Sequence, residues 1–111
     1  MYEPTGQIDA FHVAGFQYYD GATMLGAMKA GDAVEFALEP DNPHDPEAIV
    51  LRYGGVKIGY VPKSVNDAVA TMMYFGHADA FEMRILQVAP EEAPWEQVRV
   101  GIFVRDAREG K

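Results

Sequence analysis

The side chains best suited to chemistry lie in one short stretch of the sequence, Glu39–Leu51, which reads EPDNPHDPEAIVL. Pro43 and Pro46 restrict the backbone on either side of His44 and Asp45, so this His–Asp pair has little conformational freedom. Asn and Asp beside proline are also common turn formers, because their side chains bond nearby backbone N–H groups. The stretch therefore predicts either a stiff loop that holds a site or a purely structural turn.

Catalytic and metal chemistry have weaker signals. Asp45 could pair with Asp41 or Glu47 as a general acid and base, and His44 with Asp45 could supply two metal ligands. The histidines are far apart, however, and lack the short helical spacings of a metal site. The chain has no cysteine, nucleophile elbow, Walker motif or dinucleotide-binding glycine motif. We therefore expect a protein that is not an enzyme and that binds no metal or cofactor.

Tyr18 and Tyr19, in the block GFQYYDG, suggest a different chemistry. Consecutive residues of an extended segment point to opposite sides, so at most one of the two can easily join the core. An exposed tyrosine near a strand end can stack on a nucleic-acid base, at roughly 1–3 kcal/mol per base. Surface tyrosines without such a role are also common, so both interpretations stay open.

The hydrophobic pattern predicts a mainly β framework around these residues. Alternation of apolar and polar residues, as in AVEFALE and VRVGIFV, indicates strands with one buried face. The pair Gly54-Gly55 predicts a tight hairpin turn. About six strands are expected, at residues 8–14, 33–39, 47–53, 56–62, 80–89 and 96–106.

Two short helices complete the expected elements. ATMLGAMKAGD has apolar residues at helical spacing and predicts a helix that stops at Gly31. A second helix of about three turns is expected from Ser64, which with Asp67 makes an N-capping pattern, to near Gly76. Its apolar face would be Val65, Ala68, Val69 and Met72. Without any βαβ alternation, this inventory suits a small, curved or barrel-like antiparallel sheet with helices at its ends.

Composition and charge limit the class of protein, its partners and its location in the cell. At 111 residues, 49% of them apolar, the chain fits one globular domain. Its formal net charge of -8 gives no general attraction to nucleic acid, so any such binding must be local. No run approaches the roughly 18 apolar residues that span a bilayer, and the N-terminus lacks signal-peptide features. With no cysteine, a cytoplasmic location away from membranes is expected.

Three blocks, GFQYYDG, EPDNPHDPEAI and KIGYVPK, resemble the HIRAN domain family in order and spacing. The middle block is the most specific, because NPHD and EAI stand where the family has approximately Asn-Pro-Tyr-Asp and Asn-Ala-Ile. Gly59-Tyr60 and Lys63 follow where the family has Gly-Tyr or Gly-His and then a basic residue. The resemblance covers about residues 8–106, leaving 1–7 as an N-terminal extension and 107–111 as a C-terminal tail. It implies a small, OB-like modified β-barrel.

The resemblance also implies a non-catalytic module that binds nucleic acid. HIRAN domains are accessory modules of helicase-like DNA-repair and fork-remodelling proteins, and they also occur as short stand-alone bacterial proteins. One DNA-binding member captures the 3′-hydroxyl end of single-stranded DNA. By motif, Asp45 would meet the 3′-hydroxyl, Lys63 would contact a phosphate, and His44 replaces the usual Tyr beside that Asp. The expected DNA-binding residues are Gln17, Tyr18, Tyr19, His44, Asp45, Tyr60 and Lys63, and a helicase or nuclease is the expected partner protein.

Two features of the sequence support an alternative. Gln17 stands where the DNA-binding member has Arg, which removes a charge-assisted contact to phosphate. The net charge of -8 also opposes association with DNA at low salt. The alternative is a protein- or peptide-interaction module, or a structural one, that has the same fold without DNA affinity.

Overall fold

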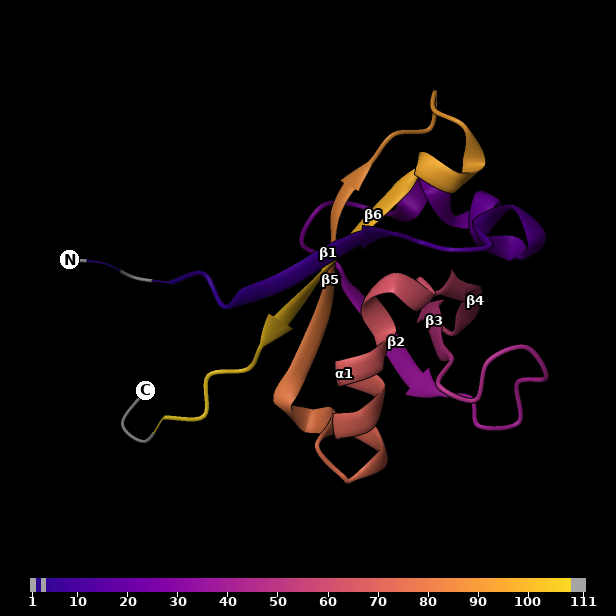
Figure 1. Ribbon diagram of the computed structural model, residues 1–111. Coiled ribbons are helices and arrows are strands. Elements are labelled where there is room, and N and C mark those ends of the chain that lie inside the picture. Colours follow the sequence, from indigo (N-terminus) through magenta and orange to yellow (C-terminus); the bar gives the residue numbers. More distant parts are fainter. Residues whose placement is uncertain (1, 3, 109–111) are drawn as a thin grey trace.

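One antiparallel sheet forms the body of the protein (Figure 1), in a computed structural model that describes residues 2 and 4–108. Within these residues the sheet has six strands, in the spatial order β1-β6-β5-β2-β3-β4. The strands are β1 (Gln7–His12), β2 (Ala33–Leu38), β3 (Ile49–Tyr53), β4 (Val56–Tyr60), β5 (Phe81–Val88) and β6 (Val98–Val104). The predicted hairpin is present, since β3 and β4 are joined across Gly54-Gly55.

The sheet curls until the chain just after β1 meets β4, the edge strand on the far side. Ala14 and Tyr60 exchange two backbone hydrogen bonds, each with an N···O distance of 2.9 Å. Gly59 permits this approach, because a Cβ there would lie 2.4 Å from the Ala14 carbonyl oxygen. The expected fold class, mainly β with a small barrel-like sheet and two helices, is confirmed.

The core fills the inside of the curl and follows the alternation of the strands. In β6, Val98, Val100 and Ile102 are buried whereas Arg99 is exposed, and Val104 at the strand end is half exposed. Burial of each large apolar side chain stabilises the fold by roughly 1.5–3 kcal/mol. The sheet therefore gives the surface loops a rigid base.

The first predicted helix is a 3-10 helix, η2 (Asp20–Ala27), which ends four residues before the predicted stop at Gly31. Its two internal glycines disfavour a regular α-helix. Ahead of it, the predicted strand at residues 8–14 is shorter, ending at His12, and the block GFQYYDG contains a short 3-10 turn, η1 (Phe16–Tyr18). Two further 3-10 turns are η3 (Ala78–Ala80) and η4 (Pro94–Glu96). Among the described residues, no helix has the length and apolar character needed to cross a membrane.

The second helix, α1 (Lys63–Tyr74), is present, but two details predicted for it are wrong. Its N-cap is Pro62, and Ser64 makes no capping hydrogen bond. Its buried face is shifted from the predicted one and consists of Asn66, Val69, Ala70 and Met73, whereas Ala68 and Met72 are exposed. Hydrophobic periodicity could not indicate this shift, because the polar residue Asn66 occupies the buried face, where it donates hydrogen bonds to the 39–48 loop.

Candidate functional site

Five of the seven predicted binding residues line one pocket of about 270 Å³. The pocket lies where the 39–48 loop, the end of β4 and the chain after β1 come together. Its lining residues are Ala14, Tyr19, Asn42, His44, Asp45, Ala48, Tyr60, Val61, Pro62 and Lys63. The other two predicted residues, Gln17 and Tyr18, are exposed and do not line it.

Asn42 holds the loop that carries His44 and Asp45. Its Oδ1 accepts hydrogen bonds from the backbone N–H groups of His44, at 2.8 Å, and of Asp45, at 3.1 Å. Its Nδ2 donates to Glu39 Oε1 at 3.0 Å. This is the structural turn that the Asn-Pro and Asp-Pro pairs indicate, and it also fixes the pocket rim.

Asp45 is fixed in turn by contacts on both of its carboxylate oxygens. Oδ1 accepts the backbone N–H of Glu47 at 2.9 Å, and Oδ2 accepts Asn66 Nδ2 at 3.0 Å. The Glu47 N–H lowers the pKa of Asp45 most, and Asn66 and the charge of Lys63 lower it further. At neutral pH the pocket rim therefore carries an oriented carboxylate, which has lone pairs left to accept another hydrogen bond.

Asn66 is a buried polar anchor for this rim. Only 1% of its surface is exposed, and its Nδ2 also donates to the Glu47 carbonyl at 3.2 Å. One side chain of α1 therefore binds both Asp45 and Glu47 and fixes the loop against the helix. Nothing in the motif resemblance pointed to this residue.

Asn66→Ala is expected to loosen the rim and to raise the pKa of Asp45, because it removes a donor that favours the ionised carboxylate. The free energy of unfolding should fall by about 1–3 kcal/mol, the usual cost of leaving such polar groups unpaired. Carboxyl-carbon NMR titration and chemical denaturation measure the two effects. Ser64→Ala, at an exposed position with no cap bond, should change neither quantity. An unchanged pKa of Asp45 in the Asn66 variant would mean that this hydrogen bond does not form in solution.

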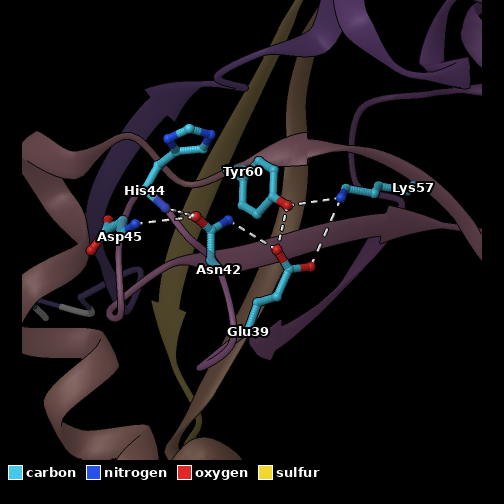
Figure 2. A network of polar contacts seen from close by, with 6 residues as sticks. All are labelled: Glu39, Asn42, His44, Asp45, Lys57 and Tyr60. Carbon is cyan, nitrogen blue, oxygen red and sulfur yellow. Dashed lines mark hydrogen bonds and ion pairs between the residues drawn. The ribbon is translucent and has the colours of Figure 1, made fainter.

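A second network lies beside the pocket, with Tyr60 between Glu39 and Lys57 (Figure 2). Lys57 Nζ donates to the Tyr60 hydroxyl at 2.7 Å, and that hydroxyl donates to Glu39 Oε1. The bond from Tyr60 lowers the pKa of Glu39, while burial raises the pKa of Tyr60. At neutral pH the network therefore holds one carboxylate, one neutral phenol and one ammonium group.

The Lys57 ammonium also lies against two aromatic rings. It is 4.4 Å from the Tyr19 centroid and 4.7 Å from the Tyr60 centroid, within the range of cation–π attraction. The two rings pack edge to face, with centroids 5.9 Å apart. Tyr19, Tyr60 and Lys57 thus form a joined aromatic and cationic surface beside the Asp45 rim.

Lys57 was not among the predicted residues, because a regular strand would place it on the face opposite Tyr60. The pairing shifts from Leu51–Gly59 to Arg52–Lys57, which leaves Ile58 as an extra residue in β4. Such a bulge reverses the alternation, so residues three apart share a face. A glycine inside a strand is the signal that could have indicated the bulge.

The block GFQYYDG separates its two tyrosines. Phe16 is buried, and Gly21 packs so closely on its ring that a Cβ there would clash. This tight reversal leaves Tyr18 77% exposed, whereas Tyr19 is half-buried and lines the pocket. Lys63 lies across the pocket, where its Nζ donates to the His44 carbonyl at 3.4 Å.

Asp45 was considered with Asp41 or Glu47 for acid–base catalysis and with His44 for metal binding. Within residues 2 and 4–108, no three His, Cys, Asp or Glu side chains lie close enough together to hold a metal ion. Both oxygens of Asp45 already accept protein hydrogen bonds. The arrangement is suited to accepting a hydrogen bond from a ligand and to contacting rings and anions.

Comparisons with known proteins agree with this architecture. The family model of the HIRAN domain matches residues 10–105. A crystal structure of a protein from Lactobacillus plantarum superimposes with a TM-score of 0.71 and 22% identity, covering 88% of this chain and 92% of that one. The crystal structure of the HIRAN domain of human HLTF superimposes with a TM-score of 0.67 and 22% identity, covering 89% of this chain and 74% of that one. No curated protein matched in sequence. At this identity the two structures show a shared fold.

Proposed function

Because the chain belongs to the HIRAN domain family, we propose that it is a non-catalytic module that binds the free 3′-hydroxyl end of single-stranded DNA. The observation that carries the proposal is that an oriented carboxylate, two tyrosine rings and Lys63 line one pocket, with the Lys57 ammonium packed against the same two rings. These groups match the three parts of a strand end, which are a hydroxyl, a base and phosphates. The family resemblance adds the wider proposal of a cytoplasmic role beside a helicase or nuclease in DNA repair or fork processing.

Each group is assigned one part of the strand end. The Asp45 carboxylate accepts a hydrogen bond from the 3′-hydroxyl, and Tyr19 and Tyr60 receive the terminal base. Lys57 and Lys63 face the phosphates, and His44 closes the rim. The exposed pair Gln17 and Tyr18 would flank the strand as it leaves the pocket.

The volume and charge of the pocket favour binding of a single-strand end over binding of a continuous duplex. The volume of about 270 Å³ is near the lower limit of small-ligand pockets, which start at about 300 Å³. Since the protein as a whole carries a charge of -8, the local lysines must supply the attraction to phosphate. Binding should therefore be short-ranged and depend on few phosphate contacts.

The proposal is tested by fluorescence anisotropy with a 5′-labelled single-stranded oligonucleotide and with the same sequence as a blunt duplex. The single strand should bind and the duplex should bind much more weakly, because pairing and stacking withhold the terminal base. Absence of binding to either DNA would favour the alternative, a protein-interaction or structural module of the same fold.

Tyr19→Ala should weaken binding of the single strand by roughly 1–3 kcal/mol, the value of one base stacked on an aromatic ring. Tyr19→Phe keeps the ring and should bind like the unaltered protein. Tyr18→Ala should weaken binding less than Tyr19→Ala, since Tyr18 would only flank the strand and does not line the pocket. Equal losses in the two alanine variants would place the stacking surface outside the pocket.

Lys63→Ala should weaken binding and flatten the dependence of log Kd on log salt concentration by about 0.7, the single-strand value for one phosphate contact. Titrations at several salt concentrations give the slope. Lys29→Ala removes the same charge from an exposed lysine outside the pocket and should leave the slope close to that of the unaltered protein. If the two variants behave alike, Lys63 contributes only to the overall charge.

A further inference from the structure

A second hollow, of about 320 Å³, is lined by different residues of the same 39–48 loop together with the C-terminal half of α1. We refer to it as the apolar groove, and its apolar lining is Leu38, Pro40, Pro46, Ala70, Tyr74 and Phe75. It shares no lining residue with the pocket that contains Asp45. The groove is therefore free for a ligand of its own.

The two aromatic residues of the apolar groove are exposed to an unusual degree. Tyr74 is 75% exposed and Phe75 is 70% exposed, although they are adjacent and pack edge to face with centroids 5.1 Å apart. Large aromatic side chains gain most from burial, and apolar groups exposed beside a hollow mark interaction surfaces. Neither residue belongs to the core of the domain.

The apolar groove has an acidic side, and no Lys, Arg or His is among the residues that line it. Glu47 lines the groove, and Asp67 lies beside it, one turn before Thr71 on α1. The negative charge of Asp67 raises the pKa of Glu47, as expected for two carboxylates that lie close together. Among the ion pairs formed within residues 2 and 4–108, none includes either carboxylate. A cation placed between them would relieve the repulsion of the two charges.

We propose that the apolar groove binds a basic, amphipathic peptide segment of a partner protein, with an apolar side chain against Tyr74 and Phe75 and a Lys or Arg at Glu47 and Asp67. Charge complementarity selects this occupant. A second copy of the chain would bring another net charge of -8, and the acidic side of the groove would repel nucleic acid. The proposed DNA pocket is not required for this binding.

The test uses the full chain and a fluorescein-labelled peptide of alternating Lys and Leu or Phe residues. Binding should be saturable, and the double variant Tyr74→Ser with Phe75→Ser should weaken it on the order of tenfold or more. Met72→Ser, at an exposed residue of α1 outside the groove, should have no effect. Backbone amide NMR shifts on peptide addition should concentrate at residues 38–47 and 67–76.

The charge requirement has its own pair of variants. Glu47→Gln should weaken peptide binding several-fold, whereas Glu91→Gln, at an exposed acid of the β5–β6 loop, should not. The Tyr74 and Phe75 variant should melt like the unaltered protein and keep its affinity for the oligonucleotide. The peptide result is therefore independent of the DNA result.

Three results would overturn the proposal. The first is equal binding of a control peptide in which every Leu and Phe is replaced by Ser, because the attraction would then be only to the negative charge of the protein. The second is unchanged affinity of the Tyr74 and Phe75 variant for the basic peptide, because the groove would then not be the binding site. The third is a dimer, seen by analytical ultracentrifugation, that the Phe75→Ser substitution dissociates, because a second copy of the chain would then cover the groove.

Discussion

Gly59→Ala is expected to lower the free energy of unfolding by roughly 3 kcal/mol or more. Gly59 has a φ of 149°, which L residues rarely adopt, and a Cβ would lie 2.4 Å from the Ala14 carbonyl oxygen and 2.6 Å from Val13 Cγ1. The carbonyl belongs to the bridge that joins the chain after β1 to β4. Because backbone cannot move aside as a flexible side chain can, the methyl group must open the closure of the sheet.

The matched control for this substitution is Gly26→Ala in η2. A Cβ at Gly26 meets nothing within 4 Å, so this variant should be neutral or stabilised by up to about 1 kcal/mol. Guanidinium denaturation of the two variants gives both values. Similar stabilities for the two would mean that the Ala14–Tyr60 bridge is not a tight closure.

The strands were predictable because each buries one face of an alternating pattern. Glu35 and Ala37 are exposed while Val34 is buried, as the sequence AVEFALE indicates. The Gly54-Gly55 turn then fixed the β3–β4 hairpin. Loop chemistry was predictable for the same local reason, since Asn42 bonds the two residues that follow Pro43.

The parts that sequence analysis missed depend on contacts between distant segments. Lys57 reaches the site through a bulge, which changes the facing of a residue without changing the apolar pattern. Asn66 is a polar residue on a buried helix face, and its partners in the 39–48 loop are 19 and 21 residues away. Tyr18 and Tyr19 are equivalent in sequence, but Tyr18 ends η1 and is exposed, whereas Tyr19 is extended and packs against Tyr60 and Lys57.

Replacement of the 3′-hydroxyl of a bound oligonucleotide with a 3′-phosphate is expected to weaken binding by more than tenfold. An ionised carboxylate accepts a hydrogen bond from a hydroxyl but repels a phosphate at the same point, and such like-charge contacts cost several kcal/mol. The pKa of Asp45 is lowered by the Glu47 N–H and by Asn66, so the carboxylate stays charged at neutral pH. The preference for a hydroxyl should fade only as the pH falls through that lowered pKa.

Asp45→Asn removes the charge but keeps a side chain that can bond the Glu47 N–H, so it should bring the two affinities closer together. A melting curve of this variant checks that the loop remains folded. The decisive measurement is an anisotropy titration of the unaltered protein with oligonucleotides that differ only in a 3′-hydroxyl or a 3′-phosphate. Capture of a strand end predicts clearly tighter binding of the hydroxyl form, and equal affinity for the two ends would contradict it.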